Sequence, residues 1–198
     1  MYIIKQRNNR IAQLLSQKQL ILHTQDLAAI WNISNKNTLH QTASRLISLK
    51  YLYPIYKSLY STRSLSKTNN LDELWALGVS AVHNYAYISC ETVLYQQGFI
   101  NTPPQYISII SHCSKNFRIA ENFYKTRQLK DQFLFSPTGI YQNDRKFGVN
   151  VADVTRAIAD MLYFNPRFHF DKKIDWLLVK KVQKKIGYPL TKKRYVYS

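Results

Sequence analysis

Apolar residues recur at helical spacing in three stretches of the first fifty residues, and a run of aromatic and β-branched residues follows them. The stretches lie at about residues 3–17, from Thr24 onward, and from a cap at Ser34 or Asn35 to about Lys50. The run at residues 51–60 predicts a two-stranded ribbon with Pro54 on an edge strand. Helices joined by a tight turn and followed by a ribbon predict a winged helix-turn-helix.

A polar stretch rich in Ser, Thr and Asn occupies residues 61–70. We place the domain boundary there, so that a winged helix-turn-helix domain (residues 1–66) precedes a mixed α+β domain (residues 67–198). In the second domain we expect helices at residues 71–78, 89–97, 153–164 and 171–186, and strands at 84–88, 106–111, 116–119, 128–135 and 146–151. The expected caps are Ser89, Gly98 and Asp153, and the expected apolar stripe of the last helix is Ile174, Leu177, Leu178 and Val182.

The chain is strongly basic, with 28 Lys plus Arg against 11 Asp plus Glu and a formal net charge of +17. Such a chain attracts polyanions, which include DNA, RNA, and acidic membrane or protein surfaces. Residues 1–70 contain ten basic side chains and one acidic side chain, Asp26. Because a carboxylate repels phosphate, this distribution favours the first domain as the nucleic-acid-binding part.

The predicted third helix keeps a polar face once Leu39, Ala43, Leu46 and Ile47 are assigned to the core. Asn and Gln on that face can each form two hydrogen bonds with adenine, and Lys can reach guanine or phosphate. We therefore predict that this helix binds DNA through Lys36, Asn37, His40, Gln41, Ser44 and Arg45. Two further candidates, for contact with the minor groove or with phosphates, are Lys57 and Arg63. The alternative in both cases is an ordinary solvated surface.

Motifs for catalysis, metals and cofactors are missing from the sequence. It has no GxGxxG, Walker or HExxH pattern, its five glycines are too few for a phosphate-binding loop, and its acids do not follow a nuclease pattern. His112 and Cys113 are strand neighbours that would point to opposite faces, so they predict no metal site. Cys90, beside Ser89 and Glu91, is expected to be a buried cysteine rather than a nucleophile. We expect no enzyme activity and no cofactor.

The two cysteines form no disulfide framework, residues 1–10 contain no apolar signal segment, and no apolar run is long enough to span a membrane. We therefore expect a cytoplasmic protein that does not bind a membrane. The predicted last helix and the residues after it are rich in basic side chains, which lie either on a solvated face or on a second surface for phosphates or an acidic partner. These are Lys172, Lys173, Lys180, Lys181, Lys184, Lys185, Lys192, Lys193 and Arg194.

Three blocks, at residues 45–60, 87–100 and 149–162, resemble the AbiEi-type antitoxins in order and spacing. The first is an Arg-Leu pair that leads through apolar positions and a basic ribbon to Tyr60, the second runs from Tyr87 to the Gly98 turn, and the third begins a helix. Asp153 and Val154 replace the serine and proline usual in the family, and Ser58 replaces the glycine usual in the wing. Asp caps a helix as well as Ser does.

The resemblance implies an antitoxin of a type IV toxin–antitoxin system, which acts in abortive phage infection. It implies that the winged domain binds inverted repeats upstream of its own operon and represses it, and that the C-terminal domain counters a cognate nucleotidyltransferase toxin, directly or indirectly. One winged domain reads one half-site, so inverted repeats imply two protomers on the DNA. The alternative is a stand-alone adaptor whose winged domain docks proteins and whose basic surface binds RNA or an acidic protein.

Overall fold

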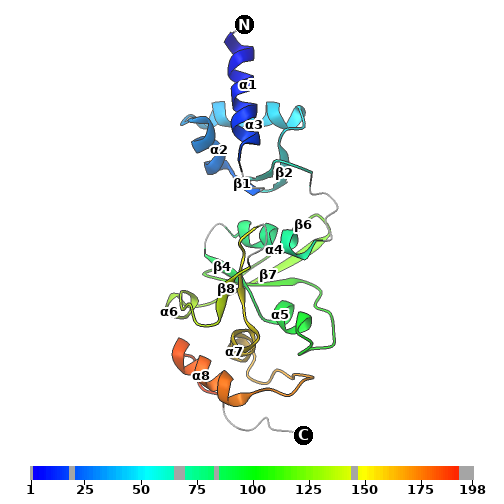
Figure 1. The fold of residues 1–198 in the computed structure, drawn as a ribbon, viewed down its shortest axis with the longest axis vertical. Coiled ribbons are helices and arrows are strands. Elements are labelled where there is room, and N and C mark those ends of the chain that lie inside the picture. The colour runs from blue at the N-terminus through cyan, green and yellow to red at the C-terminus, as the bar shows by residue number, and fades with distance from the viewer. Residues whose placement is uncertain (1, 18–20, 65–69, 83–84, 144–146, 192–198) are drawn as a thin grey trace. The chain divides into compact units, whose positions relative to one another are not determined.

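The computed structural model describes residues 2–17, 21–64, 70–82, 85–143 and 147–191. The chain is a mixed α+β protein, as the sequence predicts, and it divides into two compact units, Met1–Glu73 and Leu74–Ser198 (Figure 1). The predicted domain boundary, between residues 66 and 67, lies outside the described residues.

The first unit contains three helices and a small antiparallel sheet. Its elements are α1 (Tyr2–Leu15), β1 (Ile21–His23), α2 (Thr24–Trp31), α3 (Lys36–Ser48), β2 (Tyr53–Tyr56) and β3 (Leu59–Ser61). In the sheet, β3 pairs with β1 on one side and β2 on the other, so Pro54 lies on an edge strand as predicted. The helices and the ribbon occupy the predicted positions, whereas the three-residue strand β1 was not predicted.

The core of the first unit joins all three helices to the sheet. Its buried residues are Leu14, Leu22, Leu27, Trp31, Leu39, Ala43, Leu46 and Leu52. The α2 helix begins with a reciprocal cap in which the backbone N–H of His23 donates to Asp26 Oδ2 at 2.7 Å. It ends at Asn32, whose positive φ of 49° reverses the chain toward α3. Local capping thus fixes the tight turn between α2 and α3.

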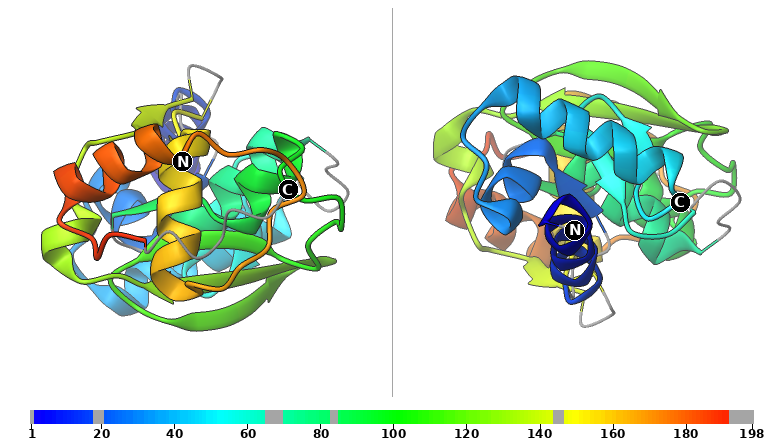
Figure 2. Two further views of the ribbon diagram at one scale, coloured as in Figure 1. Left: turned by 90° about the horizontal axis from the view of Figure 1, so that it is seen from below. Right: turned by 90° about the horizontal axis from the view of Figure 1, so that it is seen from above.

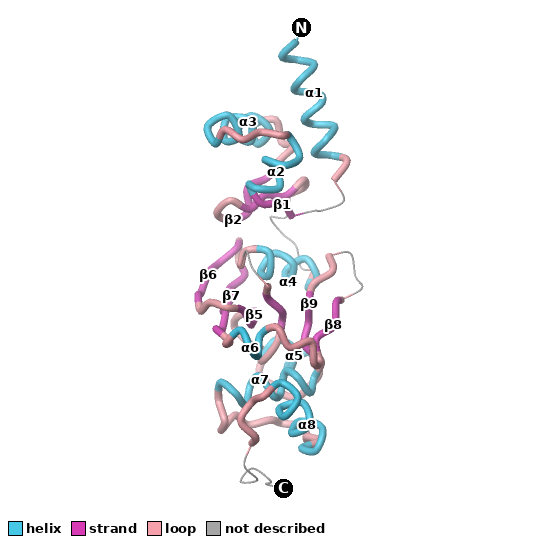
Figure 3. The backbone as a smooth tube through the Cα atoms, turned by 90° about the vertical axis from the view of Figure 1, so that its left-hand side faces the viewer, coloured by secondary structure: helices cyan, strands magenta, loops and turns pink. Residues whose placement is uncertain are grey.

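The second unit consists of a mixed sheet with helices on both faces. Its elements are α4 (Leu71–Ser80), β4 (Ala86–Ile88), α5 (Glu91–Gln96), β5 (Ile107–Ser111), β6 (Lys115–Ile119), β7 (Asn122–Gln128), α6 (Asp131–Leu134), β8 (Ile140–Gln142), β9 (Asn150–Ala152), α7 (Val154–Phe164) and α8 (Trp176–Ile186). The described strands follow the order β6-β7-β5-β4-β9-β8, with parallel pairs at β5–β7 and β4–β9. The strand β6 therefore lies at one edge (Figure 3).

Helix α4 covers one face of this sheet, and α5 and α7 lie on the other. A Cβ atom at Gly78 of α4 would come within 2.9 Å of Ile109 on β5, so α4 packs directly onto the strands. The preceding residue, Ser108, faces the opposite way, because its side-chain hydroxyl donates to Glu91 Oε2 of α5 at 2.7 Å. Helices α7 and α8 pack against each other (Figure 2).

Two predicted strands and one predicted cap of the second unit are wrong. The strand predicted at residues 146–151 is absent at residues 147–149 and begins only at Asn150, as β9, while residue 146 lies outside the described residues. Residues 128–135 are not a strand: the strand is β7, which ends at Gln128, and Asp131 begins the short helix α6. The apolar residues Phe133 and Leu134 are buried on this helical turn, whose spacing over so few residues looks the same as that of a buried strand. The predicted cap Ser89 is also wrong, because Cys90 occupies the N-cap position of α5 and the Ser89 hydroxyl donates to Asp160 instead.

The last helix starts later than predicted and presents another face to the core. It begins at Trp176 because the Asp175 carboxylate accepts hydrogen bonds from the backbone N–H groups of the next turn. Two predicted core positions are exposed, Leu177 by 83% and Leu178 by 50%. The buried positions of α8 are instead Val179, Gln183 and Ile186.

Candidate nucleic-acid interface

Helix α3 is positioned by a polar cap at its start and by an apolar face along its length. The Asn35 side chain accepts a hydrogen bond from the backbone N–H of Thr38 at 3.1 Å, which satisfies one of the free donors of the first turn. The buried positions are Leu39, Thr42, Ala43 and Leu46. Because these occupy one side of the helix, the other side is left to solvent.

The exposed side of α3 brings together all six side chains predicted for this helix. Asn37, His40, Gln41 and Ser44 lie along the centre of this face, and Lys36 and Arg45 lie at its margins. All six side chains are exposed. The sequence of α3 contains no Asp or Glu. The helix therefore presents amide, hydroxyl, imidazole and cationic groups to a ligand, and nothing on it would repel phosphate.

Contacts from α1 and α2 hold α3 in place. The Arg10 Nη1 atom donates to Thr42 Oγ1 at 3.1 Å, and Trp31 Nε1 donates to the backbone carbonyl of Arg10 at 3.2 Å. Trp31 is only 6% exposed and belongs to the core that α3 joins. These contacts fix the position of α3 within the first unit, which suits the ordered placement of several donors against a ligand.

The hairpin β2–β3 places Lys57 at its tip. Lys57 and Ser58 form a two-residue turn, in which Lys57 is exposed and Ser58 has a positive φ of 51°. The backbone carbonyl of Ser58 accepts a hydrogen bond from the backbone N–H of Thr24 at 3.0 Å, which ties the turn to the start of α2. A serine thus adopts the left-handed conformation for which glycine is better suited.

Arg63, the other predicted residue, lies just after β3 and forms an ion pair with Glu73. Its side chain is 46% exposed, so it reaches solvent while its charge is already compensated by Glu73.

Sequence reasoning missed two polar residues that extend the exposed region beyond Arg45. Ser48 ends α3, and Lys50 follows it with a positive φ of 59°; both are exposed. Their signal in the sequence is a polar and a basic residue next to the last turn of the helix.

The predicted basic residues before and on the last helix are mostly exposed, as far as the structure describes them. Lys172, Lys173, Lys181, Lys184 and Lys185 are exposed and Lys180 is half-buried, whereas Lys192, Lys193 and Arg194 lie outside the described residues. The Lys172 ammonium lies 5.0 Å from the centroid of the Phe99 ring. This arrangement fits a solvated face as well as a surface for anions.

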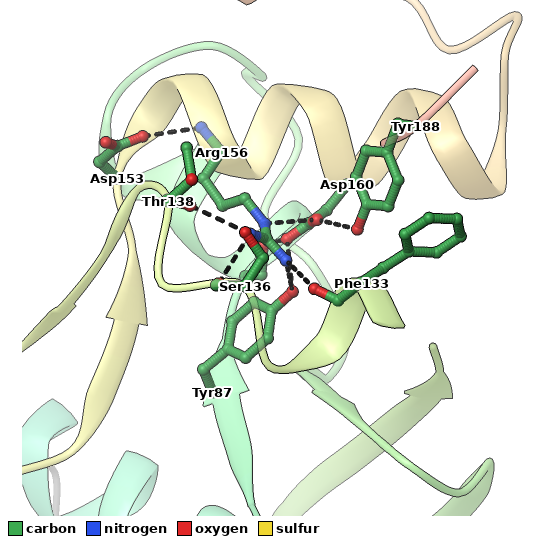
Figure 4. A network of polar contacts seen from close by, with 9 residues as sticks. Tyr87, Phe133, Ser136, Thr138, Asp153, Arg156, Asp160 and Tyr188 are labelled. Carbon is green, nitrogen blue, oxygen red and sulfur yellow. Dashed lines mark hydrogen bonds and ion pairs between the residues drawn. The ribbon is translucent and has the colours of Figure 1, made fainter. Parts of the chain in front are cut away.

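A buried polar network occupies the centre of the second unit (Figure 4). Arg156 and Asp160 of α7 are both 0% exposed, with Arg156 Nε 2.9 Å from Asp160 Oδ1. Asp160 also accepts hydrogen bonds from Ser89 at 2.8 Å, Tyr188 at 2.7 Å and Tyr87 at 3.1 Å. Burial raises the pKa of Asp160, and Arg156 acts in the opposite direction. Since solvent and ligands cannot reach these groups, the network joins α7, β4 and the end of α8 rather than forming a site.

A second polar cluster lies at the start of α5. Arg127 of β7 forms two hydrogen bonds with the Glu91 carboxylate, which also accepts hydrogen bonds from Ser108 and Tyr106. Burial alone would raise the pKa of Glu91, but Arg127 and Ser108 lower it to about 2. Burial raises the pKa of the neighbouring Cys90 thiol well above its usual value, which leaves it a poor nucleophile.

Within the residues that the structure covers, no group of three or more His, Cys, Asp or Glu side chains could hold a metal ion. None of the described helices is long and apolar enough to cross a membrane. The exposed face of α3 is the candidate nucleic-acid interface, because its polar and cationic side chains lie together on a helix without a carboxylate.

Comparison with known proteins gives little beyond the fold. No protein-family model matches the chain, and no curated protein matches it. Among solved structures, the chain is similar to the crystal structure of the RV2827C protein from Mycobacterium tuberculosis, with a TM-score of 0.55. The match covers 93% of this chain and 72% of the other at 8% sequence identity, so the likeness concerns the fold alone.

Proposed function

We propose that the first unit is a winged helix-turn-helix that binds duplex DNA, with α3 in the major groove. The observation that carries the proposal is the exposed face of α3, where six polar or cationic side chains gather on a helix without a carboxylate. The major groove of B-DNA is wide enough for one α-helix, and in helix-turn-helix proteins the helix after the tight turn contacts the base edges. Asn37 and Gln41 are the residues proposed to contact adenine, and Lys36 and Arg45 to contact guanine or phosphate.

The hairpin β2–β3 is proposed as the wing. Its pairing with β1 and the hydrogen bond from Thr24 to the Ser58 carbonyl support a fixed position relative to α2. Lys57 at the tip would contact a phosphate or the minor groove beside the site of α3. Such contacts add affinity but little sequence preference.

We further propose that the protein represses its own operon and acts as the antitoxin of a type IV system. The three sequence blocks that resemble AbiEi-type antitoxins support this, together with the exposed polar face of α3, which carries no carboxylate. The expected operator contains inverted repeats bound by two protomers, and the second unit would counter a nucleotidyltransferase toxin, directly or indirectly. This role needs binding but neither catalysis nor a cofactor.

The first experiment compares three ligands for the purified full chain across a salt series: its own upstream duplex, a scrambled duplex of the same composition, and a matched duplex RNA. Phosphate contacts alone give a steep loss of affinity with salt and no preference among sequences. The proposal predicts that the native duplex binds at least about tenfold more tightly than the scrambled one at physiological salt. Equal affinity for all three ligands would overturn it and favour an adaptor that binds anions.

A second experiment separates repression from protection. Replacing Asn37 and Gln41 together by Ala should release the operon, because specific binding is lost, while cells that co-express the toxin remain viable. The matched control is Gln25→Ala on α2, an exposed glutamine outside α3. If the α3 double variant also loses protection while it stays folded, repression and protection are not divided between the two units as proposed.

A further inference from the structure

Strands β6 and β7 expose one face that α4 does not cover. Alternate residues point toward α4: Phe117 and Tyr124 are buried there with their rings stacked at 5.1 Å, and Gly78 lies against Tyr124. The residues between them point the other way, because successive side chains of a strand lie on opposite faces. These are Asn116 and Arg118 on β6, and Phe123 and Lys125 on β7.

The outward residues form a compact block with cations placed against aromatic rings. In the sheet, Arg118 is the partner of Phe123, and Asn116 is the partner of Lys125. The Arg118 guanidinium carbon lies 4.8 Å from the centroid of the Phe123 ring, and the Lys125 ammonium lies 4.9 Å from the centroid of Tyr106. We name these residues, Tyr106, Asn116, Arg118, Phe123 and Lys125, the sheet platform.

The aromatic group at the centre of the platform is open to solvent. Phe123 is 53% exposed, so its ring contributes little to the core and is available to a ligand. Both β6 and the turn that leads to β7 lie at the edge of the sheet, where a long ligand can approach without meeting another strand. An exposed ring bordered by a guanidinium plane is a surface on which a planar group can stack.

Nearby carboxylates leave the platform positively charged. Glu91 is neutralised by the two hydrogen bonds from Arg127, and it is largely buried. Glu121 pairs with Arg118, but its side chain is 89% exposed, and such surface pairs are weak in water. A phosphate can therefore compete for Arg118, and the Lys125 ammonium is a second cation within the same block.

We propose that the sheet platform binds single-stranded RNA. Unpaired bases would stack on Phe123 and on the guanidinium of Arg118, while Lys125 contacts the phosphate backbone and the Asn116 amide reaches a base edge or a 2′-hydroxyl. Proteins recognise single-stranded RNA through stacking on aromatic rings and arginine planes beside basic groups, whereas bases inside a duplex have no free faces to stack. This site is separate from α3 and does not depend on the DNA-binding proposal.

The test measures fluorescence anisotropy of a labelled single-stranded RNA of about 12 nucleotides with the full chain. The same sequence as single-stranded DNA and as duplex RNA provides the other arms. Phe123→Ala should weaken binding of single-stranded RNA by about tenfold or more, since one stacked base is lost. Because this change removes no charge, the slope of affinity against salt should stay as in the wild type.

The matched control is Phe135→Ala, which truncates a phenylalanine of the same unit that is 59% exposed and lies outside the platform. A second pair tests the cations: Arg118→Lys keeps the charge but removes the plane and should weaken RNA binding, whereas Lys181→Gln on α8 should change it little. Circular dichroism checks that each variant is folded, and Phe123→Tyr, which keeps the ring, should bind as the wild type does.

Three results would overturn the proposal. Equal loss in Phe123→Ala and Phe135→Ala would remove the platform from the binding site. Equal or tighter binding of the duplex would mean that phosphates alone are recognised. Tighter binding of single-stranded DNA than of RNA would contradict RNA as the ligand.

Discussion

The ion pair between Arg156 and Asp160 allows a quantitative test of the structure of the second unit. Asp160→Asn keeps the shape of the side chain but removes its charge, so the buried guanidinium loses its counterion. Both side chains are 0% exposed, so bulk solvent cannot take the place of the carboxylate. Removing one partner of a buried ion pair costs about 3–5 kcal/mol of folding free energy.

The hydrogen bonds around the pair place the expected value at the lower end of this range. Arg156 also donates to the carbonyl oxygens of Phe133, Ser136 and Thr138, which spread part of its charge over backbone dipoles. The hydroxyls that donate to Asp160, such as that of Ser89, can turn to accept from an amide. We therefore expect a loss of about 3 kcal/mol, a large share of the stability of a typical domain.

Urea unfolding at pH 7, monitored by circular dichroism, measures this loss. The second unit of the variant should unfold at a lower urea concentration than that of the wild type. The control is Asp153→Asn, the same chemical change at the N-cap of α7, where Asn caps as well as Asp and the expected loss is close to zero. If the two variants unfold at the same urea concentration, Asp160 carries no charge in the folded protein, and the ion pair is refuted. Replacing both members by apolar residues, Arg156→Met with Asp160→Leu, should recover much of the loss.

Three further predictions concern single positions. Ser58→Gly should stabilise the first unit by up to about 1 kcal/mol in thermal unfolding without weakening DNA binding, since the turn requires a positive φ; a loss of stability would contradict that backbone conformation. The pKa of Glu91 is lowered from 4.5 to about 2, so wild type should exceed Glu91→Gln in stability above pH 4.5 and lose this advantage as the pH falls toward 2; a difference independent of pH would exclude the ion pair with Arg127. Gly78→Ala should cost about 1–3 kcal/mol in urea unfolding, because the new Cβ would lie 2.5 Å from the Tyr124 ring, and a neutral change would mean that α4 packs less closely.

The sequence predicts those elements whose signals are local. Helices α3 and α7 have caps and apolar spacing within one stretch, and their N-caps, Asn35 and Asp153, accept the expected backbone hydrogen bonds. The exposed face of α3 follows from the same spacing, so all six predicted residues lie together. Local pattern is sufficient here because the helix buries a single stripe.

Elements determined by distant contacts could not be predicted. In strand β7, the buried residues Tyr124 and Thr126 alternate with Phe123 and Lys125. Because most residues of this strand are polar, it contains no apolar run from which a strand could be predicted. In α8, the Gln183 amide is buried and forms hydrogen bonds with Thr191 beyond the helix, whereas Leu177 and Leu178 face solvent. The sheet platform depends on the pairing of β6 with β7, so no sequence pattern indicated it.

The central claim is that the exposed face of α3 reads the sequence of DNA. The most direct measurement is the ratio of affinities for the native and scrambled upstream duplexes, determined at one salt concentration for the wild type, for Asn37→Ala, for Gln41→Ala, and for the control Gln25→Ala. Each lost pair of base contacts should reduce this ratio by about 1–3 kcal/mol, or roughly five- to 150-fold, while affinity for scrambled DNA changes little. A ratio that stays at the wild-type value in both α3 variants would contradict the account.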